Sequence, residues 1–362
     1  MKIQERIKTL QVQMIDKKVD MAAIGPTSSM RYLLEFAPFA DERLCVLIIG
    51  IDSVSMIVPD LNAEETAAHT TVKLIPWKDS EGPQKAVQQI REINRFPGML
   101  AVDPAMRADN LLQLLNGLNP DKVITIDELI SPLRLVKSDH EIDLLQQAAW
   151  QADKAMQAAV DACVPGATEK EVVWAAESAF RKNGAEEVCF TIVASGPNGA
   201  HPHHRSRDRE IRKGDPVIID IGASFQGYKS DITRMVHLGT PDPDVLKVYD
   251  TVKHANRKAF SFVQPGVAAE DIDLVARNHL EEAGYGKAFL HRTGHGIGLD
   301  VHEPPWIMAG NKSVLQAGMV FSIEPGVYLP GKFGVRVEDI VVVTHDGVRN
   351  LTGFDHSLVV KQ

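Results

Sequence analysis

The second part of this chain repeats a pattern of helix-ending residues after 100 positions, and this repeat restricts the fold more than any other feature. Two markers shift by that distance, a Pro-Gly step between helical patterns and the glycine that closes the next helix: Pro165-Gly166 and Pro265-Gly266, Gly184 and Gly284. Further on, Gly214 lies six residues before Asp220, as Gly318 lies six before Glu324. A period this long is no solenoid repeat. It indicates two halves, each a helix pair followed by a hairpin, related by a pseudo-twofold axis.

Each half carries a pair of carboxylates on apolar, strand-like runs: Asp220 and Asp231, then Glu324 and Glu338. A hairpin centred on Phe225/Gln226 would place the first pair opposite each other, and one centred on Gly331 would do the same for the second. Cross-strand partners have Cβ atoms about 5 Å apart. Like charges at that distance repel, so two such pairs require a cation. Carboxylates combined with the imidazole of His295 suit Mn, Co, Fe or Zn.

The sequence divides near residue 130 into two predicted domains. Residues 1–130 alternate helix-like and strand-like segments, which is typical of an α/β layer with a partly parallel sheet. A boundary is expected at Ser131-Pro132. Residues 131–362 then begin with a long helix, because Ser138 and Glu141 form a capping box ahead of an apolar stripe that continues to Cys163.

Composition excludes several classes of protein. The net charge of −9 over 362 residues argues against nucleic acid as a partner. The three cysteines form no CxxC motif and no even framework, so disulfides are not expected. The first residues lack the apolar core of a signal peptide, and no apolar run is long enough to span a bilayer. We expect a cytoplasmic protein without a membrane partner.

Four motifs give residues 135–355 a family resemblance: Asp220 and Asp231 in D-x-G-x₈-D, Gly294–Gly298 followed by His302-Glu303, Ser322–Gly326, and Gly334–Asp339. With them, the chain resembles the pita-bread metallopeptidases, which include prolidase, aminopeptidase P and methionine aminopeptidase, with creatinase as a metal-free relative. The resemblance implies an α+β protein: a pita-bread domain with pseudo-twofold symmetry after a smaller α/β creatinase-like domain. It also implies a homodimer.

The resemblance further implies two divalent metal ions per chain, with manganese expected and cobalt or zinc as alternatives. All five ligand positions of the family are filled: Asp220, Asp231, His295, Glu324 and Glu338. Two such ions lower the pKa of a water molecule that bridges them, so that hydroxide is available as the nucleophile. Glu324 is expected to accept that water's proton and to pass it to the leaving amine.

Four further residues are expected at the site. His203 lies 17 residues before Asp220 and matches a substrate-binding histidine, whereas His201 and His204 read as a solvated loop. His302, seven residues after His295, matches a histidine that stabilises the oxyanion or holds the proline side of the substrate. His291 could line the site or be structural. Arg336 could orient ligands, bind a substrate carboxylate or form a structural ion pair.

The expected function is hydrolysis of Xaa-Pro bonds in small peptides with proline at the second position. A dipeptidase (prolidase) is favoured, because the N-terminal domain is short and the segment between Glu324 and Glu338 is only a tight hairpin. Aminopeptidase P activity and hydrolysis of a cyclic, ectoine-type amide are the alternatives. A non-catalytic peptide-binding module is disfavoured, because relatives of that kind lose metal carboxylates and this chain keeps them all.

Overall fold

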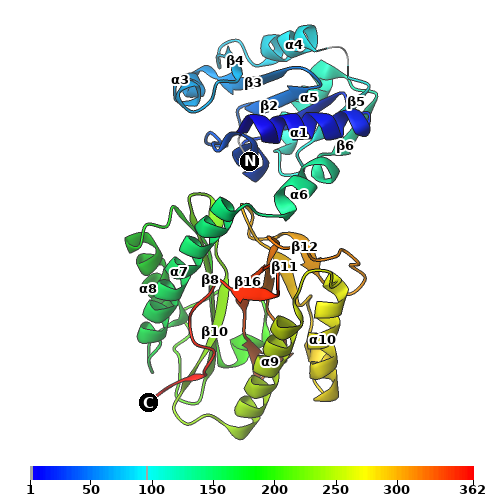
Figure 1. Cartoon of the computed structure of the whole chain (residues 1–362). Coiled ribbons are helices and arrows are strands. Elements are labelled where there is room, and N and C mark those ends of the chain that lie inside the picture. The colour runs from blue at the N-terminus through cyan, green and yellow to red at the C-terminus, as the bar shows by residue number, and fades with distance from the viewer. Residues whose placement is uncertain (1–2, 95–96) are drawn as a thin grey trace. The chain divides into compact units, whose positions relative to one another are not determined.

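The computed structural model describes residues 3–94 and 97–362 and contains two compact units, Met1–Arg134 and Leu135–Gln362 (Figure 1). The two are described separately below. Ser131-Pro132, the boundary expected from the sequence, lies within helix α6 (Asp127–Leu135). Within the described residues, no helix combines the length and apolar character that crossing a membrane requires.

The N-terminal unit is a six-stranded mixed sheet in the order β4-β3-β2-β1-β5-β6, with helices alternating along the chain. The partly parallel sheet predicted from the sequence is confirmed, since β1 pairs with β5 in parallel but with β2 antiparallel. Its elements are α1 (Ile3–Asp16), β1 (Met21–Ile24), α2 (Ser28–Leu34), β2 (Val46–Gly50), β3 (Val54–Pro59), α3 (Asp60–His69), β4 (Lys73–Trp77), α4 (Gln84–Ile93), β5 (Met99–Val102), α5 (Ala108–Leu118), β6 (Lys122–Thr125) and α6.

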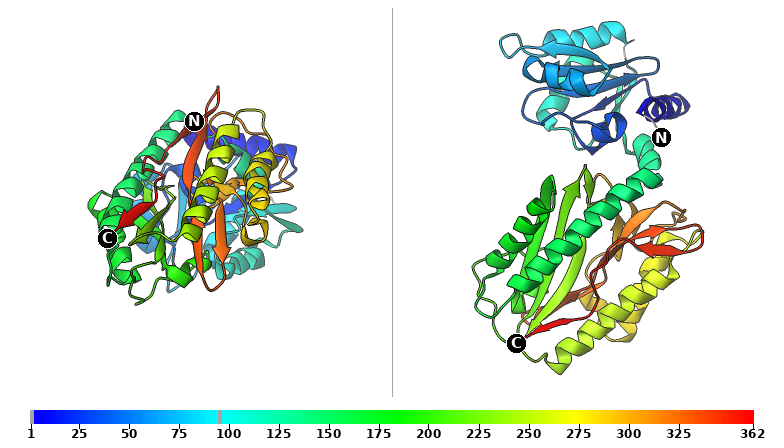
Figure 2. Two further views of the ribbon diagram at one scale, coloured as in Figure 1. Left: turned by 90° about the horizontal axis from the view of Figure 1, so that it is seen from below. Right: turned by 60° about the vertical axis from the view of Figure 1, so that its left-hand side comes forward.

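The C-terminal unit combines two helix pairs with two five-stranded sheets and one two-stranded sheet (Figure 2). The first half contains α7 (Asp139–Ala162), α8 (Glu169–Lys182), β7 (Glu187–Ser195), η1 (Gly196–Ala200), β8 (Pro216–Phe225), β9 (Tyr228–Lys229) and β10 (Ile232–Leu238). The second contains α9 (Pro243–Phe262), α10 (Ala269–Glu282), η2 (Gly286–Ala288), β11 (Gly294–Gly296), β12 (Glu303–Ile307), β13 (Val320–Ile323), β14 (Gly326–Leu329), β15 (Phe333–Arg336), β16 (Asp339–Val343), β17 (Val348–Asn350) and β18 (Val359–Lys361). The predicted capping box of Ser138 and Glu141 is present at the start of α7.

The duplication expected from the sequence is visible in matching backbone contacts of the two halves. Gly166 and Gly266 adopt φ angles of +88° and +90°, a conformation that residues other than glycine rarely adopt. Their N–H groups donate to Ile211 O and Leu315 O, each at 2.9 Å. Isolated bridges at Thr168↔Glu210 and Ala268↔Val314 also correspond. Each half therefore folds its helix pair onto its sheet through the same turn.

The first hairpin has a different register from the one predicted. Its turn is Gln226-Gly227, with φ angles of +47° and +86°, one residue later than expected. Two positive φ values suit a tight two-residue hairpin turn. Asp220 consequently lies opposite Thr233 and not opposite Asp231, so that prediction was wrong. The displacement is two positions, an even number, so both carboxylates still point to one face of the sheet.

The second hairpin has the predicted register. Ile323 lies opposite Asp339, and Gly326 lies opposite Arg336 around a turn that contains Gly331. Between these two ladders the same register places Glu324 opposite Glu338. Neither glutamate belongs to a strand, because the backbone is interrupted at both positions.

Candidate active site

One cavity of about 800 Å³ in the C-terminal unit collects every residue that the sequence singled out for the site. Its lining includes the five expected metal ligands and the four other expected site residues: Asp220, Asp231, His295, Glu324, Glu338, His203, His291, His302 and Arg336. The remaining lining residues are mostly apolar: Phe190, Ile192, Pro202, Arg292, Val301 and Met308. Asp231, His295 and Glu338 form the tightest group, with one potential ligand atom from each lying within 4.8 Å of the others.

Both halves contribute to this cavity. Asp220 lies within β8, and Asp231 immediately precedes β10, so the first half supplies one pair. His295 lies in the middle of β11, while Glu324 and Glu338 occupy the interruptions of the second hairpin. Glu338 N donates to Thr233 O at 3.3 Å, which joins the two halves directly behind the carboxylates. The duplication thus produces one site from two copies of a two-carboxylate element.

The carboxylates lie close together in a place where little water screens the repulsion between their like charges. Burial, followed by the charges of Glu338 and Asp220, raises the pKa of Asp231 well above its usual range. Burial, followed by the charges of Glu324 and Asp220, does the same for Glu338. Burial also raises the pKa of Glu324 to about 7, and Asp220 adds to this effect. A cluster of this kind is stable in ionised form only with compensating positive charge.

The imidazole of His295 is oriented as a metal ligand would be. Its Nδ1 lies 3.1 Å from Gly296 O, and since a carbonyl only accepts, Nδ1 carries the hydrogen. Burial and nearby His302 lower the pKa of His295 to about 3, so the ring is neutral. Its Nε2 lone pair then faces carboxylate oxygens, with Glu324 Oε1 at 3.3 Å and Asp231 Oδ2 at 3.7 Å. A metal ion at this place would be bound by Nε2 and by both carboxylates.

Two carboxylate oxygens support the same conclusion. Asp220 Oδ1 and Glu338 Oε1 are buried and have no hydrogen-bond partner among the described residues. Leaving a buried acceptor unsatisfied costs about 1–3 kcal/mol, and more when it is charged. The donor set of four carboxylates and one neutral imidazole suits hard or borderline divalent ions. The residues therefore fit a divalent metal centre.

Arg336 is buried behind the metal ligands and connects several of them. Its guanidinium donates to Asp220 Oδ2, to Thr233 Oγ1 at 3.1 Å and to the Tyr328 hydroxyl at 2.6 Å. Thr233 in turn donates to Glu338 Oε2 at 2.7 Å, so one arginine fixes ligands from both halves. Among the readings left open by the sequence, the geometry favours ion pairing that orients ligands, because the guanidinium is already engaged.

His291 lies at the end of the same chain of hydrogen bonds. Its Nε2 is 2.8 Å from the Tyr328 hydroxyl, and its Nδ1 is 2.8 Å from Arg292 O. The carbonyl requires the hydrogen on Nδ1, so Tyr328 donates to Nε2. Burial and the charge of Arg336 lower the pKa of His291 to about 4, which keeps it neutral. Tyr328 was missed by the sequence reasoning, although it lies four residues after Glu324 on the same hairpin.

His302 and His203 line the cavity beside the ligands. The His302 ring meets the His295 ring edge-on, with centroids 4.2 Å apart, and burial and Arg292 lower the pKa of His302. His203 lies in the loop between η1 and β8, and it too lines the cavity. Both histidines therefore line the cavity beside the expected ligands.

The loop that carries His203 is held by Glu169, the first residue of α8, which is completely buried. Its carboxylate accepts hydrogen bonds from Ser195 N at 2.8 Å and Asn198 Nδ2 at 2.9 Å, and lies 2.8 Å from His204 Nε2. Burial opposes ionisation, but the hydrogen bonds from Asn198, Ser195 and His204 lower the pKa of Glu169. His204 is thus a partly buried anchor of this loop and not the solvated loop residue that the sequence suggested. Glu169 was missed, since its partners lie 26 or more residues away.

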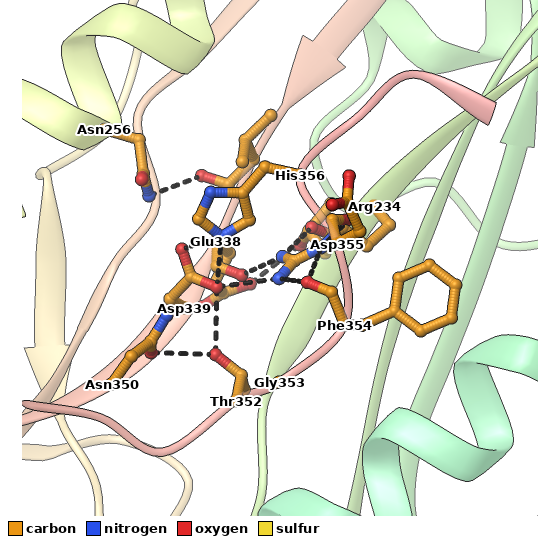
Figure 3. Close-up of polar contacts among 12 residues, drawn as sticks. Arg234, Asn256, Glu338, Asp339, Asn350, Thr352, Gly353, Phe354, Asp355 and His356 are labelled. Atoms are coloured by element: carbon orange, nitrogen blue, oxygen red, sulfur yellow. Dashed lines mark hydrogen bonds and ion pairs between the residues drawn. The ribbon is translucent and has the colours of Figure 1, made fainter.

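Behind the site, buried polar side chains hold the backbone of the ligand-bearing segments (Figure 3). Arg234 donates to Glu338 O at 2.5 Å and forms an ion pair with Asp339 at 2.7 Å. Asp339 also contacts His356, 2.8 Å away. Asn256 donates to Ile323 O at 2.8 Å and to Val337 O at 3.4 Å, the residues just before the two glutamates. Asp339 points away from the cavity, so its role is to support the neighbouring ligand.

The two units match family models of known proteins. Residues 143–345 match metallopeptidase family M24, and residues 6–136 match the creatinase/prolidase N-terminal domain. The chain is 40% identical over 343 residues to a protein named probable dipeptidase PepE from Mycobacterium tuberculosis, covering 93% of this chain and 91% of that one. It is 34% identical over 357 residues to an Xaa-Pro dipeptidase from Pyrococcus horikoshii, covering 98% and 99%.

Solved structures agree with these relatives. A recombinant prolidase from Thermococcus sibiricus superposes with a TM-score of 0.95 at 40% identity, with 99% of each chain covered. An X-Pro aminopeptidase from Thermotoga maritima has a TM-score of 0.84 at 32% identity, covering 96% of this chain and 98% of that one. The chain therefore belongs to metallopeptidase family M24. It is a metallopeptidase in which a pita-bread unit follows a creatinase-type N-terminal unit, as the sequence resemblance implied.

Proposed function

We propose that this metallopeptidase hydrolyses the Xaa-Pro bond of dipeptides. The observation that carries the proposal is the buried cluster of four carboxylates and neutral His295, whose lone pairs face one another in the cavity. Similarity to proteins named prolidase and Xaa-Pro dipeptidase supports the choice of substrate. Similarity to an X-Pro aminopeptidase keeps longer Xaa-Pro peptides as the second candidate.

In this proposal two divalent ions are held by Asp220, Asp231, His295, Glu324 and Glu338, with manganese as the first choice. When bound, such ions activate a water molecule and polarise the scissile carbonyl. The unmatched oxygens of Asp220 and Glu338 support the assignment of both residues as ligands. Arg336 and Thr233 hold these two carboxylates in orientation through their hydrogen bonds.

The chain's own residues also handle the proton and the substrate. Glu324 is assigned to take the proton of the attacking water and to return it to the proline nitrogen, which leaves as a secondary amine and must be protonated. In the same proposal His302 donates to the developing oxyanion and His203 holds the substrate, and both line the cavity.

The proposal includes a cytoplasmic homodimer. Three unpaired cysteine thiols, two of them buried, are compatible with a reducing compartment. The homodimer is carried over from the resemblance to the prolidase branch, and size-exclusion chromatography with light scattering tests it directly.

The function is tested with a panel of Xaa-Pro dipeptides and Xaa-Pro-Yaa tripeptides, after reconstitution with Mn, Co or Zn. Proline release from dipeptides should exceed release of the Pro-Yaa product from tripeptides, and a chelator should abolish both. Cleavage of tripeptides alone would identify an aminopeptidase. Failure to cleave any Xaa-Pro bond with two ions bound would contradict the proposal.

A further inference from the structure

A buried ion pair next to the cavity-lining His302 takes no part in the proposed chemistry. Lys137, which precedes the N-cap residue of α7, donates from Nζ to Glu303 Oε1 at 2.8 Å. The side chains of Lys137 and Glu303 are only 1% and 6% exposed. Removing two charges from water can cost more than their attraction returns, and apolar side chains of similar size are often equally stable in their place. Stability alone therefore does not explain this pair.

Glu303 closes the loop of residues 297–302, which joins β11 to β12. One of its carboxylate oxygens, Oε2, accepts a hydrogen bond from Asp300 N at 3.3 Å within that loop. The other oxygen lies against the backbone of the loop, because a Cβ added at Gly298 would fall 2.6 Å from Oε1. A single buried carboxylate thus holds the loop that ends at His302.

The position of the His302 ring depends on this loop. Within the part of the chain that the structure describes, no hydrogen bond reaches the ring, and its edge-on contact with His295 leaves its height in the cavity to the backbone. The backbone at His302 is in turn held by the adjacent Glu303. A displacement of about 1 Å at a reacting group can lower a rate by about 100-fold. Support of this loop therefore bears directly on catalysis.

Lys137 is itself fixed through its backbone. Its N–H donates to Gly318 O at 2.9 Å, and a Cβ added at Gly318 would lie 2.9 Å from Lys137 O. The lysine supplies the positive charge that keeps the buried Glu303 ionised, and an ionised carboxylate accepts hydrogen bonds more strongly than a neutral one. We infer that Lys137 is a positioning residue, which acts through Glu303 on the loop that places His302 at the oxyanion. The inference rests on the role proposed for His302.

The first test is a double-mutant cycle between Lys137 and His302. It measures kcat, KM and metal content of the manganese-loaded wild type, Lys137→Met, His302→Ala and the double variant, with alanyl-proline as substrate. Lys137→Met should lower kcat by roughly tenfold or more, with KM and metal content close to those of the wild type. In the His302→Ala background it should lower kcat by less than about twofold, since the side chain through which Lys137 acts is gone. Equal losses in both backgrounds would overturn the inference.

A second apolar substitution separates positioning from stability. Lys137→Met alone should lower Tm, because it leaves Glu303 buried without a counter-charge, whereas Lys137→Met with Glu303→Leu should return Tm to near the wild-type value. Its kcat should stay low, because leucine accepts no hydrogen bond from Asp300 N. Met156→Ala, at a fully buried position of α7, is the matched control that lowers Tm and leaves kcat unchanged. Recovery of kcat together with Tm in the double apolar variant would reduce the pair to a structural role.

A measurement that does not depend on turnover keeps this inference separate from the proposed function. In zinc-loaded protein with isotope-labelled histidine, the ring signal of His302 is assigned by NMR from its loss in His302→Ala. That signal should shift in Lys137→Met and stay in place in Met156→Ala, and an unchanged signal in Lys137→Met would contradict the inference. If the wild type cleaves no Xaa-Pro bond, the proposed function fails, and the His302 signal still decides whether Lys137 positions that ring.

Discussion

Glu324→Gln should stabilise the metal-free protein while it abolishes hydrolysis. The substitution keeps the size of the side chain but removes one negative charge from a buried cluster. In the metal-free site, burial and the neighbouring Asp220 raise the pKa of Glu324 from 4.5 to about 7. The side chain is only 16% exposed, so water screens this effect weakly. Above pH 7 the folded, metal-free protein therefore holds Glu324 in its ionised form, which burial disfavours.

The size of the effect follows from proton linkage. A difference of about 2.5 pKa units corresponds to about 3 kcal/mol at 1.36 kcal/mol per unit. Because the folded state binds this proton more tightly than the unfolded state, the unfolding free energy of the metal-free wild type falls as pH rises from about 4.5 to about 7. Glutamine carries no such penalty. The variant should therefore gain little at pH 5 and about 3 kcal/mol at pH 8.

The assay is urea unfolding of chelator-treated wild type and variant at pH 5, 6, 7 and 8, followed by circular dichroism. In a thermal unfolding experiment the same gain of about 3 kcal/mol would raise Tm by roughly 6–12 °C for a unit of this size. Adding manganese should reverse the order, since the wild type gains stability from bound metal and the variant gains less. Parallel pH profiles, or a variant that is less stable at pH 8 without metal, would refute the reasoning.

Three further results are expected. A gently purified, active sample should contain about two divalent ions per chain by mass spectrometry, and chelation should remove both the ions and the activity. His203→Ala and His302→Ala should keep the wild-type metal content yet lose catalytic efficiency, with His302→Ala lowering kcat by roughly a hundredfold if it donates to the oxyanion; loss of a metal ion in either variant would place that histidine among the ligands. Gly334→Ala should destabilise the fold strongly in thermal unfolding, since the added Cβ would lie 1.9 Å from Gly199 O. Gly331→Ala is the control: the added atom meets open space, and only the φ of +73° opposes the substitution, at a cost of about 1 kcal/mol.

Hairpin spacing predicted the two carboxylate pairs, and the family resemblance supplied His203 and His302; one cavity collects all of these residues. The second hairpin register followed from Gly331, since the chain is symmetric about that turn. The first did not, because Gln226 accepts a positive φ that favours glycine and so moves the turn by one residue. A local conformation of a single residue thus decided the cross-strand partner of Asp220.

The residues that support the site were beyond sequence reasoning for a different reason. Glu169, Asn256 and Arg234 each act on backbone groups that lie 26 or more residues away. Which carbonyl or N–H such a side chain reaches depends on how the two halves pack, and no periodic pattern encodes that.

The C-terminal unit consists of two similar halves in one chain, and strand β18 connects them through its pairing with β10. β18 pairs in parallel with β10, so a strand that follows the second half completes the sheet of the first. Residues 240–242, which join β10 to α9, are largely exposed. A break there would leave one fragment with Asp220 and Asp231 and the other with His295, Glu324 and Glu338. Neither fragment would hold a complete centre, and recovered peptidase activity would report their encounter, which makes this turn a natural place to build a split reporter.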